Sequence, residues 1–433
     1  MAIFLTAVII EAAFAAFCIV TKSKHAKERS IIRIACFAGF LLLAVLPIID
    51  WGFRYYALAT LLLLLSIIGV KTLIQKKEEK REYKALRVVL KAIGMTALIF
   101  AAVLPAVIFP QNKAVVEASG EYRVSTKTYT VIDESRVEGY ADTDKNRKLN
   151  VQFWYPDSFD KTFPVIVFSH GGLGVKTSNE SLYKELAGHG YVVCSIDHTY
   201  QCFYTTDEDG KTTLIDLGYM QELFAEDAQS DIRQSFEYYR KWMEIRIGDM
   251  NFIIDHIIAE SKNNNAGMAY KLADITKIGV MGHSLGGSAA LGIGRIRDDV
   301  GAVIALESPF MYDIESIEDD RFIFMDTVYP VPVLNVYSDS SWEILAKRPQ
   351  YAANHAMLTD TEATAFNVHI SGVGHLGLTD FSLTSPFLTR TLDRMKSTKE
   401  KAIHCLETIN MVCLEFFDCY LKGEGEFISS GSY

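Results

Sequence analysis

Long apolar runs are confined to the first quarter of this 433-residue chain. There are four of them, at about 2–20, 31–49, 55–74 and 86–109. Each has close to the roughly 20 apolar residues that a helix needs to cross about 30 Å of hydrocarbon. Glu11 makes the first run the weakest, because a charge inside hydrocarbon is costly unless it faces protein or water. The pattern predicts a region of four transmembrane helices over residues 1–110.

Positive charge in the connecting loops predicts how these helices are oriented. The first loop and its flank hold Lys22, Lys24, Lys27, Arg29 and Arg33, and the third holds Lys71, Lys76, Lys77, Lys80, Arg81, Lys84, Arg87 and Lys91. The short loop 50–54 between them holds one basic residue. By the positive-inside rule, the two basic loops are cytoplasmic. We therefore expect a multi-pass protein of the cell membrane whose C-terminal part is extracytoplasmic.

The pattern changes after a polar connector at about 111–125. Short apolar segments that predict strands alternate there with helical stretches. The strands are expected at 149–155, 165–169, 191–196, 278–281, 300–306, 333–337 and 365–370, and the helices at 179–188, 222–261, 285–296 and 399–422. The strand segments are mostly apolar on both faces, as in a parallel sheet that is buried on both sides. Residues 126–433 are therefore predicted to form one α/β domain with helices on both faces of the sheet.

Charge divides the chain at the same place. Residues 1–110 carry 14 lysines and arginines against 6 acidic residues, whereas the remaining 323 carry 29 against 47. An acidic domain repels a polyanion, so nucleic acid is not an expected partner. No spacing of Cys and His is typical of a metal site, and we expect neither a metal nor another cofactor. Buried thiols are the expected state of the seven cysteines, although Cys194 and Cys202 would pair if a bend joined them.

The segment Gly282-His283-Ser284-Leu285-Gly286 carries the strongest chemical signal. Gly-x-Ser-x-Gly is a weak motif alone, but here an apolar strand precedes it and a helix rich in small residues follows it. This context is that of a nucleophile elbow, which lifts a serine hydroxyl above the sheet at the start of a helix. The alternative is a glycine-rich turn without chemistry. We predict that Ser284 is a nucleophile.

A serine nucleophile needs a base and a group that stabilises an oxyanion. His375 lies in a glycine-rich loop after the last predicted strand, where the base of such a sheet is expected. His369, within the strand, and His404, on a late helix, are expected to be packing or surface residues. The loop at 168–174, Phe-Ser-His-Gly-Gly-Leu-Gly, is similar to the His-Gly-Gly-Gly loop of esterases. Backbone N–H groups of Gly172 and Leu285 are the predicted oxyanion donors, and His170 is expected to brace the loop.

These segments resemble the platelet-activating-factor acetylhydrolase family, in its plasma or type II α/β-hydrolase branch, over about residues 147–420. The matching pieces are the Phe-Ser-His-Gly segment at 168, Ser-Ile-Asp-His at 195, Gly-His-Ser-Leu-Gly-Gly at 282, Ala-Leu-Glu at 305, and the helix with Arg246, Asp249, Phe252 and Asp255. The resemblance implies an α/β-hydrolase fold and cleavage of short or oxidised acyl chains from phospholipids without a metal. The four predicted membrane helices are not part of that pattern.

The acid of the triad has two candidates. The family places it after the strand that follows the nucleophile helix, in an Ala-Leu-Asp context, and this chain has Glu307 there. Most other α/β-hydrolases place it after the next strand, where Asp339 fits. Either carboxylate would hold the base in the right tautomer and stabilise its cation. Glu307 is preferred, and Asp339 remains the alternative.

The resulting hypothesis is a membrane-anchored serine esterase that acts on short-acyl or lipid-like carboxylic esters, with membrane lipids around it. Aromatic residues at 203, 204, 219 and 224 are candidates to line an acyl pocket, although ordinary core packing fits them as well. An acyltransferase, a polyester hydrolase or a peptidase would use the same triad. A membrane sensor that keeps the hydrolase fold without turnover is an alternative of another class.

Overall fold

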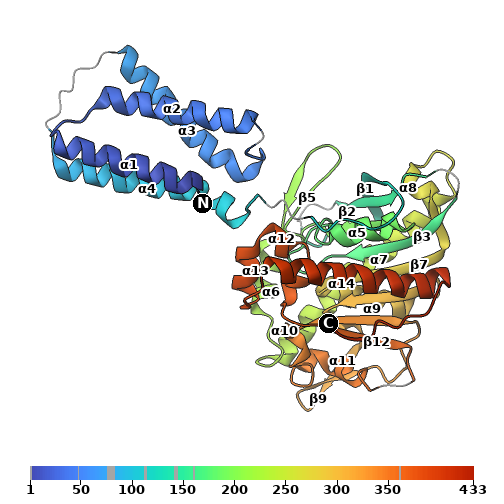
Figure 1. Cartoon of the computed structure of the whole chain (residues 1–433). Helices are drawn as coiled ribbons and strands as arrows, with labels where there is room; N and C mark the ends of the chain where they lie inside the picture. The colour runs from blue at the N-terminus through green and yellow to red at the C-terminus, as the bar shows by residue number, and fades with distance from the viewer. Residues whose placement is uncertain are drawn as a thin grey trace. The chain divides into compact units, whose positions relative to one another are not determined.

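The computed structural model describes residues 2–433 except 47, 76–82, 112–114, 141–144, 159–160 and 360–361. The chain forms two compact units, coloured from blue to red along the chain in Figure 1. The first comprises Met1–Lys113 with Thr384–Leu388, and the second comprises Ala114–Leu383 with Thr389–Tyr433.

Four helices lie within the described residues of the first unit's N-terminal segment. They are α1 (Ala2–Val20), α2 (Ala26–Val45), α3 (Phe53–Ile74) and α4 (Ala85–Ile108). α1 packs against α4, and α3 packs against both α2 and α4. Large side chains on α3, such as Leu64, Ile67 and Ile68, are more than half exposed. Apolar side chains that point outward in this way are typical of a surface that faces lipid.

The structure supports the prediction of four membrane spans only in part. Among the described residues, α3 and α4 are long and apolar enough to cross a membrane, and Leu5–Val20 is a shorter apolar helix. The second span was expected to begin at residue 31, but α2 begins at Ala26 because its polar first turns are also helical. Four basic residues of the third loop, Lys76, Lys77, Lys80 and Arg81, lie outside the described residues.

A sheet of nine strands, counted over the described residues, forms the centre of the second unit. Its order is β1 (Val124–Val137), β2 (Asn146–Pro156), β4 (Val192–Asp197), β3 (Phe163–Ser169), β7 (Ala273–His283), β8 (Val300–Leu306), β11 (Val333–Ser338), β12 (Ala365–Ile370) and β13 (Gly431–Ser432). The β1–β2 and β2–β4 pairs are antiparallel, and the other pairs are parallel. All seven predicted strands belong to this sheet.

Helices cover both faces of the sheet (Figure 1). α7 (Ile232–Ser261) and α9 (Leu285–Ile296) pack on the face that receives Val165 and Val167 of β3. α5 (Glu180–Gly188) and α14 (Lys399–Phe417) pack on the face that receives Ile166 and Phe168. Successive side chains of one strand thus enter two separate cores, which is why β3 is apolar at every position except its last.

Several boundaries differ from the sequence prediction. The long helix expected at 222–261 is two helices, α6 (Leu217–Ala225) and α7, and the Asp231 side chain caps α7 by accepting from the Gln234 N–H. The helix expected at 399–422 ends as an α-helix at Phe417 and continues as one π turn. β1 was not predicted, because it is an edge strand with few apolar residues, of which Ile132 and Val137 are exposed while the polar Asp133 is buried.

The remaining elements are short. They are the hairpins β5 (Tyr204–Thr206) with β6 (Thr212–Leu214) and β9 (Ile314–Glu318) with β10 (Arg321–Phe324), together with α8 (Met268–Lys271), α10 (Asp339–Trp342), α11 (Ala352–Ala356), α12 (Phe381–Thr384) and α13 (Pro386–Leu392).

Candidate active site

Ser284 occupies the turn between β7 and α9. Its φ of 55° and ψ of −126° lie in a region that L-residues rarely adopt. The Ser284 N–H donates to the Leu306 carbonyl at 2.8 Å, and the Ser288 N–H donates to the Ser284 carbonyl at 3.0 Å. The strand before it and the helix after it therefore hold this strained backbone in place. The geometry is that of the predicted nucleophile elbow.

Two glycines allow the elbow to form. A Cβ on Gly282 would lie 2.4 Å from the carbonyl carbon of Gly286, and a Cβ on Gly286 would lie 2.0 Å from the carbonyl oxygen of Ser169. Both neighbours are backbone atoms, which cannot rotate out of the way. Only glycine fits at either position, so the two glycines of the motif are explained by close backbone approach.

His375 lies directly beside the elbow, at the start of a 3-10 turn after β12. The His283 Nε2 is hydrogen bonded to the His375 carbonyl oxygen at 3.1 Å, and the two rings lie 4.6 Å apart between centroids. The His375 N–H donates to Ser340 Oγ at 3.0 Å. The residue next to Ser284 in the chain therefore contacts the predicted base.

Glu307 follows β8 and is the carboxylate that meets His375. Its Oε1 lies 3.3 Å from His375 Nδ1, and its Oε2 accepts from the Ser338 N–H at 2.8 Å. The Glu307 side chain is 2% exposed, whereas the imidazole is 33% exposed. Burial favours the neutral acid, but the imidazole and the Ser338 N–H outweigh it and lower the pKa of Glu307. Burial likewise disfavours the imidazolium, but the carboxylate outweighs it and raises the pKa of His375.

Asp339, the alternative acid, pairs with another histidine. Its Oδ1 lies 2.8 Å from His369 Nε2, and its Oδ2 accepts from the Gly372 N–H at 2.8 Å. The Trp342 ring stacks on the His369 ring with centroids 4.8 Å apart. These contacts fix the loop that leads to His375. The structure thus brings Glu307, rather than Asp339, to His375, and the role of each carboxylate in catalysis stays a prediction.

The loop after β3 lies against the elbow. A Cβ on Gly171 would lie 3.4 Å from Ser284 Cβ and 2.9 Å from His283 Nδ1. Leu285, the other predicted oxyanion donor, is the first residue of α9. His170 bonds within the loop, from its Nδ1 to the Gly171 carbonyl at 2.6 Å, as expected of a bracing residue. Gly172 and Leu285 therefore lie on the two segments that meet at Ser284.

The aromatic residues proposed for an acyl pocket differ in their burial. Tyr219 is fully buried, and its hydroxyl donates to the Gly172 carbonyl at 3.1 Å, so it supports the loop. Phe203, Tyr204 and Phe224 are between 48% and 74% exposed. Tyr219 therefore fits the ordinary core packing that the sequence also allowed, and an acyl pocket lined by the three exposed aromatic residues stays a prediction.

A buried polar network that the sequence analysis missed lies behind the loop. Asp249 on α7 accepts from Arg147 at 2.6 and 3.0 Å, from Arg136 at 2.9 Å, and contacts His198 Nδ1 at 2.9 Å. His198 Nε2 is 2.8 Å from Ser169 Oγ. Burial, reinforced by Arg246, lowers the pKa of His198 to about 4, so this imidazole is neutral at pH 7. Ser169, His198 and Asp249 are connected like a catalytic triad but are fully buried.

A sequence signal for this network exists. Arg246 and Asp249 fall on the same face of the predicted helix as Met243, Ile247 and Met250, all of which are buried. Charged residues within an apolar helical stripe are rarely buried without partners. That pattern marks the pair for a buried role.

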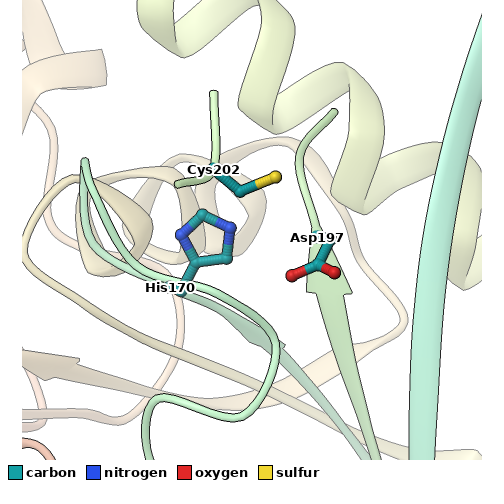
Figure 2. A group of neighbouring side chains, drawn as sticks. All are labelled: His170, Asp197 and Cys202. Atoms are coloured by element: carbon teal, nitrogen blue, oxygen red, sulfur yellow. The ribbon is translucent and has the colours of Figure 1, made fainter. Parts of the chain in front are cut away.

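Figure 2 shows a second group of buried side chains, His170, Asp197 and Cys202, whose potential metal-ligand atoms lie within 4.8 Å of one another. Asp197, at the end of β4, already accepts from the Lys176 ammonium at 2.6 Å and from the Thr205 hydroxyl at 2.7 Å. His170 Nδ1 is likewise engaged, by the Gly171 carbonyl at 2.6 Å. The group is accounted for by contacts within the protein, and Cys194 and Cys202 are not bridged.

Comparisons with known proteins give consistent results. The family model of platelet-activating factor acetylhydrolase, isoform II, matches residues 130–430. A platelet-activating factor acetylhydrolase from Canis lupus familiaris is 28% identical over 140 residues, which are 30% of this chain and 31% of that protein. The match thus spans about a third of the curated relative. A ferulic acid esterase from Streptomyces cinnamoneus superposes with a TM-score of 0.54 at 18% identity, covering 72% of this chain and 94% of its own, which shows a shared fold.

Proposed function

Because the chain belongs to the platelet-activating factor acetylhydrolase, isoform II, family, we propose that it is a serine esterase that hydrolyses short-acyl or lipid-like carboxylic esters. The observation that carries this proposal is the position of His375 beside the elbow of Ser284, where it contacts the neighbouring His283. Ser284 has a strained φ of 55°, its neighbour His283 touches His375, and His375 pairs with the buried Glu307. Strain of this kind persists where the surroundings enforce it, and it is common at active sites.

The proposed reaction is acyl transfer through a covalent intermediate. Ser284 Oγ attacks the ester carbonyl carbon while His375 Nε2 accepts the hydroxyl proton. Glu307 holds Nδ1–H of His375 and stabilises the imidazolium that forms. His375 then gives its proton to the leaving alcohol, and the acyl group remains on Ser284. A water molecule attacks this acyl-enzyme with His375 again as the base, and the carboxylic acid leaves.

Backbone N–H groups are the proposed oxyanion hole. Gly172 on the loop after β3 and Leu285 at the first position of α9 would each donate to the negative oxygen of the tetrahedral intermediate. The start of α9 also carries the positive end of the helix dipole, which favours negative charge there. Removing one such donor typically slows catalysis by about 10² to 10³-fold.

The membrane anchor is proposed as four spans in the cell membrane, with the catalytic unit outside the cytoplasm. The length and composition of α3 and α4 support spanning, and the basic residues of the loops support the orientation. Such an anchor would keep the enzyme at a bilayer, where lipid esters are concentrated. Membrane lipids are therefore its proposed surroundings and the source of its substrates.

The test uses the full chain in detergent with p-nitrophenyl acetate, butyrate and palmitate. Wild type should turn over the short esters fastest, and Ser284→Ala should lose at least about 10³-fold in kcat. Ser230→Ala, at an exposed serine, is the matched control. A fluorophosphonate probe should label wild type and Ser230→Ala but not Ser284→Ala. Equal turnover by wild type and Ser284→Ala would refute the proposed function.

A further inference from the structure

Arg246 is a fully buried arginine at the centre of α7. Its guanidinium donates hydrogen bonds to uncharged acceptors. It donates to the His170 carbonyl at 2.5 Å, the Gln201 carbonyl at 3.0 Å and side-chain oxygen at 3.1 Å, and the Tyr219 hydroxyl at 3.2 Å, with a longer contact of 3.4 Å to the Gly171 carbonyl. These are all its recorded hydrogen bonds within the described part of the chain.

A buried cation is normally paired with a carboxylate, because desolvation of an unpaired charge is costly. The nearest candidate by position is Asp249, one turn further along α7. Both of its oxygens are engaged by Arg136, Arg147 and His198. Arg246 instead directs its charge at the backbone of the loop after β3, so a function for the charge is expected at that loop.

Peptide geometry determines what this contact does. In a trans peptide, the C=O of one residue and the N–H of the next point in opposite directions. Arg246 holds the carbonyl of His170, and Tyr219 holds the carbonyl of Gly172. The Gly171 carbonyl between them is hydrogen bonded to His170 Nδ1 at 2.6 Å and accepts from the Gly174 N–H at 3.0 Å, with Arg246 at a longer 3.4 Å. The N–H groups of Gly171, Gly172 and Leu173 are therefore turned away from Arg246 and Tyr219. The loop lies against Ser284 at Gly171.

We propose that Arg246 is the positioning residue of the oxyanion hole: together with Tyr219 it fixes the peptides on either side of the one that joins Gly171 to Gly172, so that the Gly172 N–H faces the reacting carbonyl. This inference rests on the proposed function. Tyr219 provides a second contact to the loop, since its hydroxyl donates to the Gly172 carbonyl and accepts from Arg246. The guanidinium charge also polarises the peptides that it holds, which strengthens their N–H groups as donors.

The role predicts an effect on the transition state rather than on substrate binding. The oxyanion exists in the tetrahedral state and not in the bound ester, so a misplaced Gly172 N–H lowers kcat and leaves KM nearly unchanged. Arg246→Lys keeps the charge but cannot hold several carbonyls in a planar fork. Tyr219→Phe keeps the ring and removes only the hydroxyl. We expect kcat losses of about 10² for Arg246→Lys and about 10 for Tyr219→Phe.

The experiment uses the full chain in detergent and measures kcat, KM and inhibition by a trifluoromethyl ketone. Ser284 Oγ adds to the carbonyl carbon of this ketone, and the product carries an oxyanion like that of the tetrahedral intermediate. Inhibition should weaken by the same factor as kcat falls. Arg295→Met is the matched control, because Arg295 is also largely buried but contacts Asp313, Thr327 and Val328. It should keep kcat and the inhibition constant near wild type, whatever it does to the melting temperature.

If Ser284→Ala is inactive, so that the proposed function holds, two results would still overturn the inference. One is a kcat for both Arg246→Lys and Tyr219→Phe within twofold of wild type. The other is a loss of kcat without weaker inhibition by the ketone, which would indicate a general structural defect. If Ser284→Ala itself keeps the wild-type rate, the proposed function fails and this inference fails with it. Tyr219→Phe keeps the test valid if Arg246→Lys does not fold.

Discussion

Replacement of Glu307 by Gln is the sharpest test of the candidate triad, because the structure separates the two possible acids. The amide keeps the size of the side chain and removes its charge. Glu307 Oε1 is 3.3 Å from His375 Nδ1 and the side chain is 2% exposed, whereas Asp339 is 32% exposed and pairs with His369. We therefore compare Glu307→Gln with the matched variant Asp339→Asn.

The distance sets the expected magnitude. Two unit charges 3.3 Å apart attract by about 5 kcal/mol at an effective dielectric constant of about 20. The attraction acts when His375 becomes an imidazolium, so it lowers the barrier, and 5 kcal/mol corresponds to about 10³ to 10⁴-fold in kcat. The imidazole is one-third exposed, and solvent screening reduces this, so we expect a loss of at least about 10²-fold. Asp339→Asn removes only a loop contact and should cost less than about tenfold.

The assay records kcat/KM against pH for wild type and both variants. Glu307 outweighs burial and raises the pKa of His375, and only a neutral imidazole acts as the base. Wild-type kcat/KM should therefore rise with pH through a pKa above the ordinary value of about 6.5. Glu307→Gln removes the main cause of the raised pKa of His375, although Asp393 also raises it, so the acidic limb of its profile should move to lower pH. A loss of 10²-fold in Asp339→Asn, with Glu307→Gln near wild type, would refute the reasoning.

Three further outcomes are expected. Gly286→Ala should lower the free energy of unfolding by about 3 kcal/mol or more, since its Cβ would lie 2.0 Å from the Ser169 carbonyl oxygen. Thermal unfolding measures this effect, and an unchanged melting temperature would contradict the close approach. Asp249→Asn should lower the free energy of unfolding by about 1–3 kcal/mol, because Arg147 keeps Glu138 and Arg136 keeps Asp133 but the buried carboxylate that both share with His198 loses its charge. Urea unfolding followed by tryptophan fluorescence tests this. In intact cells, an impermeant maleimide should label Asp50→Cys and not Lys24→Cys, and the reverse result would invert the proposed topology.

The elbow at Ser284 and the position of His375 beside it were accessible from the sequence because each depends on local pattern, while their roles as nucleophile and base stay predictions. Gly-x-Ser-x-Gly between an apolar strand and a helix specifies an elbow from adjacent residues, and the elbow is present at Ser284 with its positive φ. His375 followed from its place after the last predicted strand. Seven of the nine described strands of the sheet followed from apolar runs, since most of them are buried on both faces.

The acid and the support of the oxyanion loop depend on contacts between distant segments. Glu307 and Asp339 both follow strands, and only the fold shows that one reaches His375 while the other reaches His369. Arg246 contacts a loop 75 and 76 residues away. The apolar stripe of α7 indicated that Arg246 is buried, but only the fold shows which loop it contacts. In the membrane region the predicted start of the second span was too late, because the charged residues in the first turns of α2 are also helical.

The fully buried Ser169, His198 and Asp249 carry a broader lesson for assigning enzymes from coordinates. A template search that scores only atom connectivity would return this trio as a hit beside the elbow. What distinguishes them is access: a serine without contact to solvent meets no ester, however well its imidazole is oriented. A reagent that must reach the serine hydroxyl oxygen therefore identifies a nucleophile in this fold more reliably than a search for matching side chains.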